Sequence, residues 1–198
     1  NKVPYSDSFD IAFYYRPFSG VSGDFYDFHF ENDILQGMSL FDVSGHGIAS
    51  ALVTMIAKSI VSRIYAEHRE QDLGSIMKIV NDELIKEIGN VNNYLTGLII
   101  RFNDDTIEYV NAAHPDILMK SNDKVFSADD FFDDIEHGTF LGIKQITFNY
   151  ASSFIPVNSG EYIIMYSDGI IDANKYSNDD IIYYNKKLAN AFEAAPKG

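Results

Sequence analysis

The spacing of hydrophobic positions changes several times along the chain and predicts a mixture of strands and helices. Short runs rich in aromatic and β-branched residues, bounded by turn-forming Gly, Asn, Asp and Pro, are typical of strands. We expect strands at Ile11–Tyr15, Phe25–Phe30, Ile34–Phe41, Tyr94–Phe102, Thr106–Asn111, Ile117–Lys120, Ile146–Phe154 and Tyr162–Tyr166. Polar triplets at 31–33 and 103–105 separate two pairs of these runs and predict hairpins.

A first helix is predicted over Ile48–Tyr65, where apolar residues recur every three or four positions. Ser44 is a candidate cap near its start. The side that would face the core is formed by Ile48, Leu52, Met55, Ile56 and Ile60. The Met55 and Ile56 stripe is therefore interpreted as core.

Two further helices are expected, one over Ser75–Ile88 with Asp72 near its cap, and one over Asp179–Phe192. Residues 121–139 are polar and acidic, which predicts a long loop with a helical turn at Phe131–Phe132.

The order of these elements favours an α+β fold, because one pair of helices is inserted between runs of strands. Alternating apolar positions predict two antiparallel sheets packed face to face, flanked by helices. The length of 198 residues suits one domain, and no internal repeat or linker divides it. We therefore interpret residues 1–198 as a single domain.

The net charge of −14 argues against nucleic-acid binding, which needs a basic surface. The excess acid has two interpretations, solubility or the binding of metal ions. The chain contains no cysteine, which excludes disulfides, thiolate zinc sites and cysteine nucleophiles. Hydrolytic chemistry in this chain would therefore need another source of nucleophile.

The first residues of the chain and the length of its apolar runs indicate where the protein is located in the cell. We expect no apolar run to approach the roughly 20 residues of a membrane span, so no membrane contact is predicted. The sequence begins at Asn1 without an initiating Met or a signal segment, which favours a fragment of a longer protein. A cytoplasmic domain is the simpler expectation.

Three aspartates lie within three residues of a glycine, where predicted strands begin or end. Asp24 and Asp42 are 18 residues apart, and Asp168 follows the apolar run that ends at Tyr166. Carboxylates at strand ends, where glycine lets the backbone come close, suit hard divalent cations. Each aspartate alone is also compatible with an ordinary turn, but the three together favour a metal site.

Other candidate residues keep two interpretations each. Arg16 precedes the first acidic turn, where its guanidinium is suited to a phosphate or to a surface salt bridge. His46 lies in the glycine turn after Asp42 and is a candidate ligand, a general acid or a structural hydrogen-bonding group. His114 is interpreted as a structural histidine. Ser44 lacks the surroundings of a nucleophile.

These motifs, in this order, resemble the SpoIIE/RsbU-like branch of the PPM (type 2C) metal-dependent serine/threonine phosphatases. The segments that carry the resemblance are Gly23–Asp27, Asp42–Gly47 with Ala49 and Ala51, Asn111–Pro115, Leu141–Gly142 and Tyr166–Gly169. The first two segments are the most specific.

The resemblance implies a two-sheet sandwich flanked by helices, with two Mn²⁺ or Mg²⁺ ions at one end. In that family Asp42 would contact both metals and the Val43 carbonyl one of them. Asp24 would lie in the inner or outer ligand shell, and Asp168 would hold the second metal. The expected substrate is a phosphorylated regulatory protein of the STAS-type, anti-anti-sigma-like class. An upstream sensor domain in the same chain is expected, and a homodimer is one arrangement open to the protein.

Paired cations would neutralise a phosphomonoester and lower the pKa of a water that attacks phosphorus, so no protein nucleophile is required. The chain departs from the family pattern at Ser22 and Ala113, where glycine is common. Another metal-binding aspartate is expected in an Asp-Asp-Ile-Thr-like strand, but Asn178–Ile182 places Asp179 only 11 residues after Asp168, within a predicted helix. The alternative is therefore a regulatory module that binds a partner with little or no catalysis.

Overall fold

The chain folds into strands and helices in nearly the order that the sequence predicts. The computed structural model describes residues 6, 9–17, 22–89, 91–128, 138–172 and 178–196. Its strands are β1 (Phe25–Glu31), β2 (Ile34–Val43), β3 (Leu95–Phe102), β4 (Thr106–Ala112), β5 (Leu118–Ser121), β6 (Lys124–Ser127), β7 (Ser153–Pro156) and β8 (Tyr162–Ile164). The helices in the described part are α1 (Ile48–Glu67), α2 (Leu73–Ile88), α4 (Gly169–Asp172) and α5 (Asn178–Ala194).

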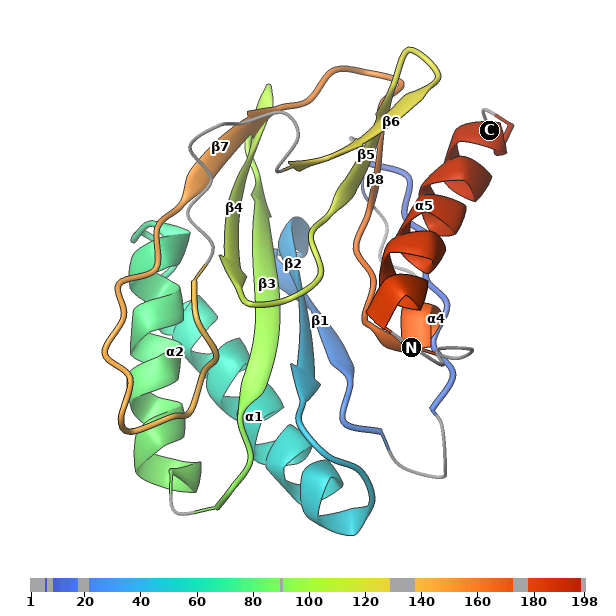
Figure 1. Cartoon of the computed structure of the whole chain (residues 1–198). Helices are drawn as coiled ribbons and strands as arrows, with labels where there is room; N and C mark the ends of the chain where they lie inside the picture. Colours follow the sequence, from blue (N-terminus) through green and yellow to red (C-terminus); the bar gives the residue numbers. More distant parts are fainter. Residues whose placement is uncertain are drawn as a thin grey trace.

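Two antiparallel sheets form the centre of the molecule (Figure 1). The larger has the strand order β1-β2-β3-β4-β7, and the smaller has the order β6-β5-β8. The β1–β2 hairpin turns at Asn32 and Asp33, whose φ angles are 48° and 64°. Two successive left-handed residues match the twist of a tight hairpin and are tolerated by Asn and Asp. The hairpin predicted at 31–33 is confirmed.

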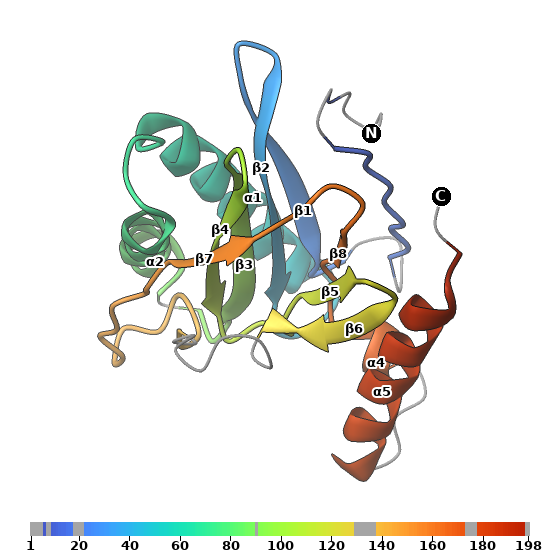
Figure 2. The ribbon, with the colours of Figure 1, turned by 90° about the horizontal axis from the view of Figure 1, so that it is seen from above.

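The sheets and helices form four layers, which are seen from above in Figure 2. Helices α1 and α2 cover the outer face of the larger sheet, and α5 lies against the smaller sheet. The predicted α+β sandwich of two antiparallel sheets flanked by helices is therefore confirmed.

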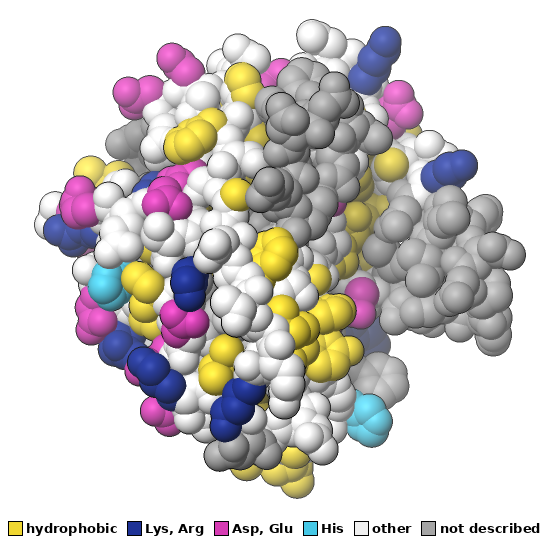
Figure 3. Space-filling model, turned by 60° about the vertical axis from the view of Figure 1, so that its left-hand side comes forward, with side chains coloured by type: hydrophobic (Ala, Val, Ile, Leu, Met, Phe, Trp, Pro, Cys, Tyr) yellow, Lys and Arg dark blue, Asp and Glu magenta, His cyan; other side chains and the backbone are white. Residues whose placement is uncertain are grey.

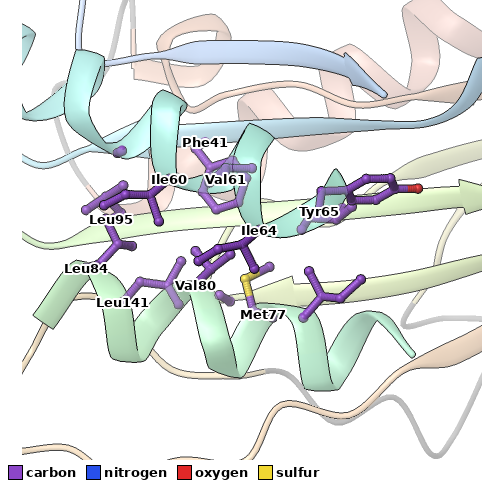
Figure 4. Close-up of a cluster of buried hydrophobic side chains, with 14 of the residues drawn as sticks. Phe41, Ile60, Val61, Ile64, Tyr65, Met77, Val80, Leu84, Leu95 and Leu141 are labelled. Carbon is purple, nitrogen blue, oxygen red and sulfur yellow. The ribbon is translucent and has the colours of Figure 1, made fainter. Parts of the chain in front are cut away.

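The first core layer lies between the two long helices and the larger sheet. Figure 4 shows side chains of α1 and α2 pointing toward one another and toward the strands. The fully buried members include Phe41, Val61, Met77, Val80, Leu84, Leu95 and Leu141. Burying a side chain of this size contributes about 1.5–3 kcal/mol relative to exposure, so this layer fixes α1 and α2 on the sheet.

The other two core layers involve the smaller sheet. Leu98, Ile107 and Ile155 of the larger sheet pack against Met119 of β5, together with neighbouring residues. On the outer face, the buried Lys120 ammonium donates hydrogen bonds of 3.1, 2.9 and 2.7 Å to the carbonyls of Phe192, Glu193 and Ala195. These carbonyls lie at the C-terminal end of α5 and just beyond it, where carbonyls lack amide partners within the helix. Lys120 therefore anchors the end of α5 to β5.

Two predicted strands are wrong in part. Ile11–Tyr15 forms no strand; instead the Phe13 and Tyr15 rings lie 5.1 and 5.7 Å from the Tyr26 ring of β1. Within Ile146–Phe154, only the residues from Ser153 onward belong to a strand. Tyr150 is buried against the helical core layer, so the alternating apolar positions serve packing rather than pairing.

The predicted core face of α1 is also wrong. Ile48, Leu52 and Met55 are 78%, 58% and 71% exposed, and Ile56 is exposed as well. The buried side is formed by Ser50, Val53, Ala57, Ile60, Val61, Ile64 and Tyr65. Apolar residues occur on both sides of α1, so periodicity alone selected the wrong one, and only Ile60 was placed correctly.

Length and composition would also allow α1 to cross a membrane, contrary to the expectation that no run approaches that length. In this fold its buried side packs on the larger sheet and α2. The core helix of a globular domain can therefore be as long and as apolar as a membrane-spanning helix.

The helix caps differ in outcome. Asp72 caps α2 as predicted, because its side chain accepts a 2.9 Å hydrogen bond from the Ser75 amide. The prediction for Ser44 is wrong, since Gly47 precedes α1 and provides no side-chain cap.

The loop predicted at 121–139 is wrong in part, because residues 124–127 form strand β6. The turn predicted at Phe131–Phe132 lies outside the described residues.

The surface on the side of α2 mixes both signs of charge with scattered hydrophobic side chains (Figure 3). On α2, Lys78 pairs with Asp82 at 3.0 Å and Lys86 pairs with Glu83 at 2.9 Å. Such exposed pairs contribute little stability, typically about 0.2–1 kcal/mol each. This face is a solvated one.

Candidate metal centre

Asp24 and Asp42 are brought together by the pairing of β1 with β2. Phe25 of β1 pairs with Phe41 of β2. Asp24 directly precedes Phe25 and Asp42 directly follows Phe41, so in this antiparallel pair both aspartates lie at the same end of the ladder. The two rings stack with centroids 5.2 Å apart. On the neighbouring strand, a side chain at Gly97 would stand only 2.0 Å from the Phe41 ring, so glycine makes room for it.

Asp168 reaches the same place from the other sheet. It follows β8 and directly precedes α4. One carboxylate oxygen from each of Asp24, Asp42 and Asp168 lies within 4.8 Å of the others. Asp24 and Asp42 are half-buried, whereas Asp168 is exposed. Three segments separated by up to 144 residues therefore present acidic oxygens to one point, as the sequence predicts.

Asp24 is held in place by its neighbours. The Ser167 hydroxyl donates a 3.2 Å hydrogen bond to its Oδ2 atom, and its own amide donates to the Ser22 hydroxyl at 3.1 Å. Burial raises the pKa of Asp24, while hydrogen bonds with Ser167 and Asp42 act in the opposite direction. Close carboxylates in a partly desolvated site favour a proton or a cation between them.

The backbone around Gly23 fits a metal site. A side chain at Gly23 would stand 2.6 Å from the Val43 carbonyl oxygen and 3.3 Å from Asp42 Oδ1. Glycine therefore keeps the space beside these two oxygens open. Carboxylate and carbonyl oxygens are the donors that Mg²⁺ and Mn²⁺ prefer, so the residues present fit these ions.

Helix α1 is hydrogen-bonded to the same backbone. The Thr54 hydroxyl donates to the Gly23 carbonyl at 3.0 Å, and the Ser50 hydroxyl approaches the Val43 carbonyl at 3.5 Å. Sequence patterns gave no hint of Ser50 or Thr54, since polar residues on a helix have many uses. Their hydroxyls fix the first turns of α1 relative to the acidic cluster.

Ser44 has a structural role that was not predicted. Its hydroxyl accepts a 2.9 Å hydrogen bond from the Tyr94 amide, and its carbonyl accepts a 2.6 Å bond from the Asn93 side chain. Ser44 thus ties the turn after Asp42 to the loop before β3. In this contact the Ser44 hydroxyl acts as a hydrogen-bond acceptor.

Arg16 and His46, the candidate substrate-binding residues, are both exposed. His46 lies in the turn between Asp42 and α1, whereas Arg16 belongs to the segment at 9–17 that packs along β1. Their roles stay predictions.

The segment Asn178–Ile182 begins α5, so its backbone is helical as expected and does not form the additional strand of the family pattern.

The chain resembles known phosphatases in sequence. The sequence profile of the family described as Stage II sporulation protein E (SpoIIE) matches residues 36–198. The phosphoserine phosphatase RsbP of Bacillus subtilis is 27% identical over 173 residues, which is 84% of this chain and 41% of RsbP. This chain therefore spans less than half the length of that relative.

Solved structures with the same fold include the RsbU and RsbW domains of Rv1364c from Mycobacterium tuberculosis. That structure has a TM-score of 0.70 at 18% identity and covers 89% of this chain and 47% of its own. The catalytic domain of the serine/threonine phosphatase PstP, solved with two manganese ions, has a TM-score of 0.59 at 12% identity. It covers 90% of this chain and 80% of its own.

The profile match extends over most of the chain and includes Asp42 and Asp168. The layered fold and the relatives agree with the resemblance seen in the motifs. The chain therefore belongs to the SpoIIE family, in the SpoIIE/RsbU branch of the PPM-type serine/threonine phosphatases.

Proposed function

We propose that this chain is a phosphatase domain that hydrolyses phosphoserine or phosphothreonine on a regulatory protein. The observation that carries the proposal is the convergence of Asp24, Asp42 and Asp168 within 4.8 Å. The family membership and the phosphoserine phosphatase relative support the same activity.

The acidic cluster and one carbonyl would hold two Mn²⁺ or Mg²⁺ ions. Asp42 would contact both ions, the Val43 carbonyl one of them, and Asp168 the second, while Asp24 would lie in the inner or outer shell. When bound, such ions neutralise phosphate charge and make a bound water nucleophilic near neutral pH. Ser167 would orient Asp24 through the hydroxyl that already bonds its carboxylate. Asp42 would be kept in register by the β1–β2 ladder.

Substrate contacts are proposed from position and chemistry. Arg16 would bind the phosphate oxygens bidentately, and His46, exposed beside the acidic turn, would contact the phosphorylated segment. The substrate would be a STAS-type regulatory protein, and the domain would follow a sensor domain in a longer cytoplasmic protein. A homodimer is compatible with this arrangement.

The test is phosphate release from a phosphoserine protein, or slow turnover of an aryl phosphate, with and without Mn²⁺. We expect Mn²⁺-dependent release, and we expect Asp42→Asn to lower it at least 100-fold because one ligand to both ions is lost. Asp82→Asn, which removes an exposed carboxylate of α2, is the control and should leave turnover unchanged. Wild-type turnover by the Asp42 variant would refute the role assigned to Asp42.

A second function, partner binding, is favoured by two observations. The exposed apolar side chains of α1 are available to a partner, and the helical backbone of Asn178–Ile182 does not form the additional metal-binding strand of the family pattern. The domain would then bind a partner with little turnover, and α1 would couple partner binding to the acidic cluster. Calorimetry with Mn²⁺ separates the two functions. Two sites with turnover support the phosphatase, whereas one weak site without hydrolysis supports the binding module.

A further inference from the structure

A buried histidine contacts the strand that pairs with Asp42, but it is not part of the acidic cluster. His114 is 5% exposed, in the turn between β4 and β5. Its backbone is fixed by Asn111, whose side chain accepts a 2.8 Å bond from the His114 amide and donates a 3.0 Å bond to its carbonyl. The turn therefore holds the imidazole in one place.

One end of the His114 ring contacts the strand next to Asp42. Its Nδ1 atom lies 2.9 Å from the Thr96 hydroxyl. Thr96 is on β3, directly opposite Asp42 in the β2–β3 register. His114 thus touches the residue that pairs with Asp42 across the ladder.

The other end of the ring faces the segment that carries Asp168. The β5–β8 ladder ends at the Leu118–Ile164 pair, four residues after His114 and four residues before Asp168. Tyr166 is buried two residues before Asp168. Burial lowers the pKa of His114 to about 4, and the nearby Tyr166 main chain acts in the opposite direction. In the described part of the chain, the Nε2 atom of His114 is buried and has no hydrogen-bond partner.

We infer that His114 is a positioning residue that bridges Thr96 and the Tyr166 main chain, and so sets the separation of Asp42 and Asp168. The inference rests on the proposed metal-dependent function. A neutral imidazole has one N–H and one acceptor nitrogen. The Nε2–H group would donate toward the Tyr166 carbonyl, and Nδ1 would accept from the Thr96 hydroxyl. Removing a group that orients a metal ligand through hydrogen bonds commonly weakens metal affinity about 10–100-fold.

The first test is Mn²⁺ titration by calorimetry of the wild type and of His114→Phe, which keeps a ring but no nitrogen. We expect the dissociation constant to rise at least tenfold. Thr96→Val removes the other end of the bridge with little change in shape, should also weaken binding, and serves if the histidine variant does not fold. Wild-type affinity in either folded variant would overturn the bridge.

The matched control is His29→Phe. His29 is likewise 5% exposed with its pKa lowered to about 4, but it lies at the other end of the sheet, where Nε2 bonds Ser39 at 3.1 Å. We expect this variant to lose stability and to keep its Mn²⁺ affinity within about twofold. An equal loss of affinity in both variants would mean general destabilisation and would refute the specific role of His114.

Nitrogen NMR of the histidine rings gives a readout that does not depend on metal. We expect His114 to be neutral with its proton on Nε2, and we expect added Mg²⁺ to shift the Nε2 signal. A proton on Nδ1 would overturn the bridge whether or not metal binds. Failure of the wild type to bind metal, with the Nε2–H form observed, would instead count against the proposed function alone.

Discussion

Ala113 is the clearest case in which one residue departs from what its backbone favours. It has a φ angle of 54°, in the left-handed region, in the turn that presents His114. The resemblance had marked this position as one where glycine is common, and the backbone angle supplies the physical reason. A left-handed conformation costs a non-glycine residue about 1–2 kcal/mol.

Ala113→Gly should remove this strain, but the greater freedom of glycine in the unfolded chain offsets about 0.5–1 kcal/mol of the gain. We therefore expect a net stabilisation of the domain by about 0.5–1 kcal/mol. Urea unfolding measures the change. Ala112→Gly, at a fully buried strand position, is the control and should destabilise. A lower urea midpoint for the Ala113 variant would show that the turn carries no such strain.

At this scale the sequence predicted the three aspartates but not the groups that hold them. Aspartates near glycines at the ends of apolar runs are a local pattern, so Asp24, Asp42 and Asp168 were identifiable before the fold was known. Ser50 and Thr54 act through contacts between distant segments. Ser167, next to Asp168, and Ser22, two residues before Asp24, are such groups that lay at recognisable motifs.

Helix α1 has apolar residues on two sides, and only one of them belongs to the core. We expect Met55→Ser, on the exposed side, to change the free energy of unfolding by less than about 0.5 kcal/mol. Ile60→Ala, on the buried side, should cost about 2–5 kcal/mol because it opens a cavity. Chemical denaturation of both variants measures this contrast. A similar loss in both would mean that the exposed side is covered in solution.

The elements were predicted where the pattern was one-sided and missed where it was ambiguous. Helix α2 has one apolar side and an Asp72 cap, and both were identified. Strand β6 was missed although Asn122–Asp123 repeats the Asn32–Asp33 pair of the first hairpin, with φ angles of 49° and 63°. That repeated Asn-Asp pair was the available signal for a second tight hairpin.

The stability of the whole molecule should depend on pH through two buried histidines. His29 and His114 have pKa values lowered to about 4, mainly by burial. In the unfolded chain each would titrate near 6.5, so between pH 6.5 and 4 the unfolded state binds more protons than the folded state. Stability is therefore fully present above about pH 6.5 and is lost as pH falls toward 4.

We expect the free energy of unfolding to fall by about 2 kcal/mol for each histidine between pH 7 and 5. Urea denaturation at several pH values measures this slope. His29→Phe should remove roughly half of it, because one of the two buried imidazoles is gone. A slope unchanged in that variant would show that His29 does not supply it.

The overall architecture was predictable because alternating strands around one inserted helix pair allow few arrangements. The packing of residues 146–152 against the helical layer was not, because an extended segment and a paired strand share the same alternation. The position of α5 on the smaller sheet likewise depends on contacts such as that of Lys120, which no local pattern encodes.

The central claim is that the three acidic side chains bind divalent ions together. Anomalous diffraction from crystals soaked in manganese tests it most directly. The account predicts a manganese peak coordinated by Asp42, with Asp168 and the Val43 carbonyl among the surrounding ligands and Asp24 beside it. Well-ordered carboxylates with no manganese peak between them, at a concentration that saturates related sites, would contradict the account.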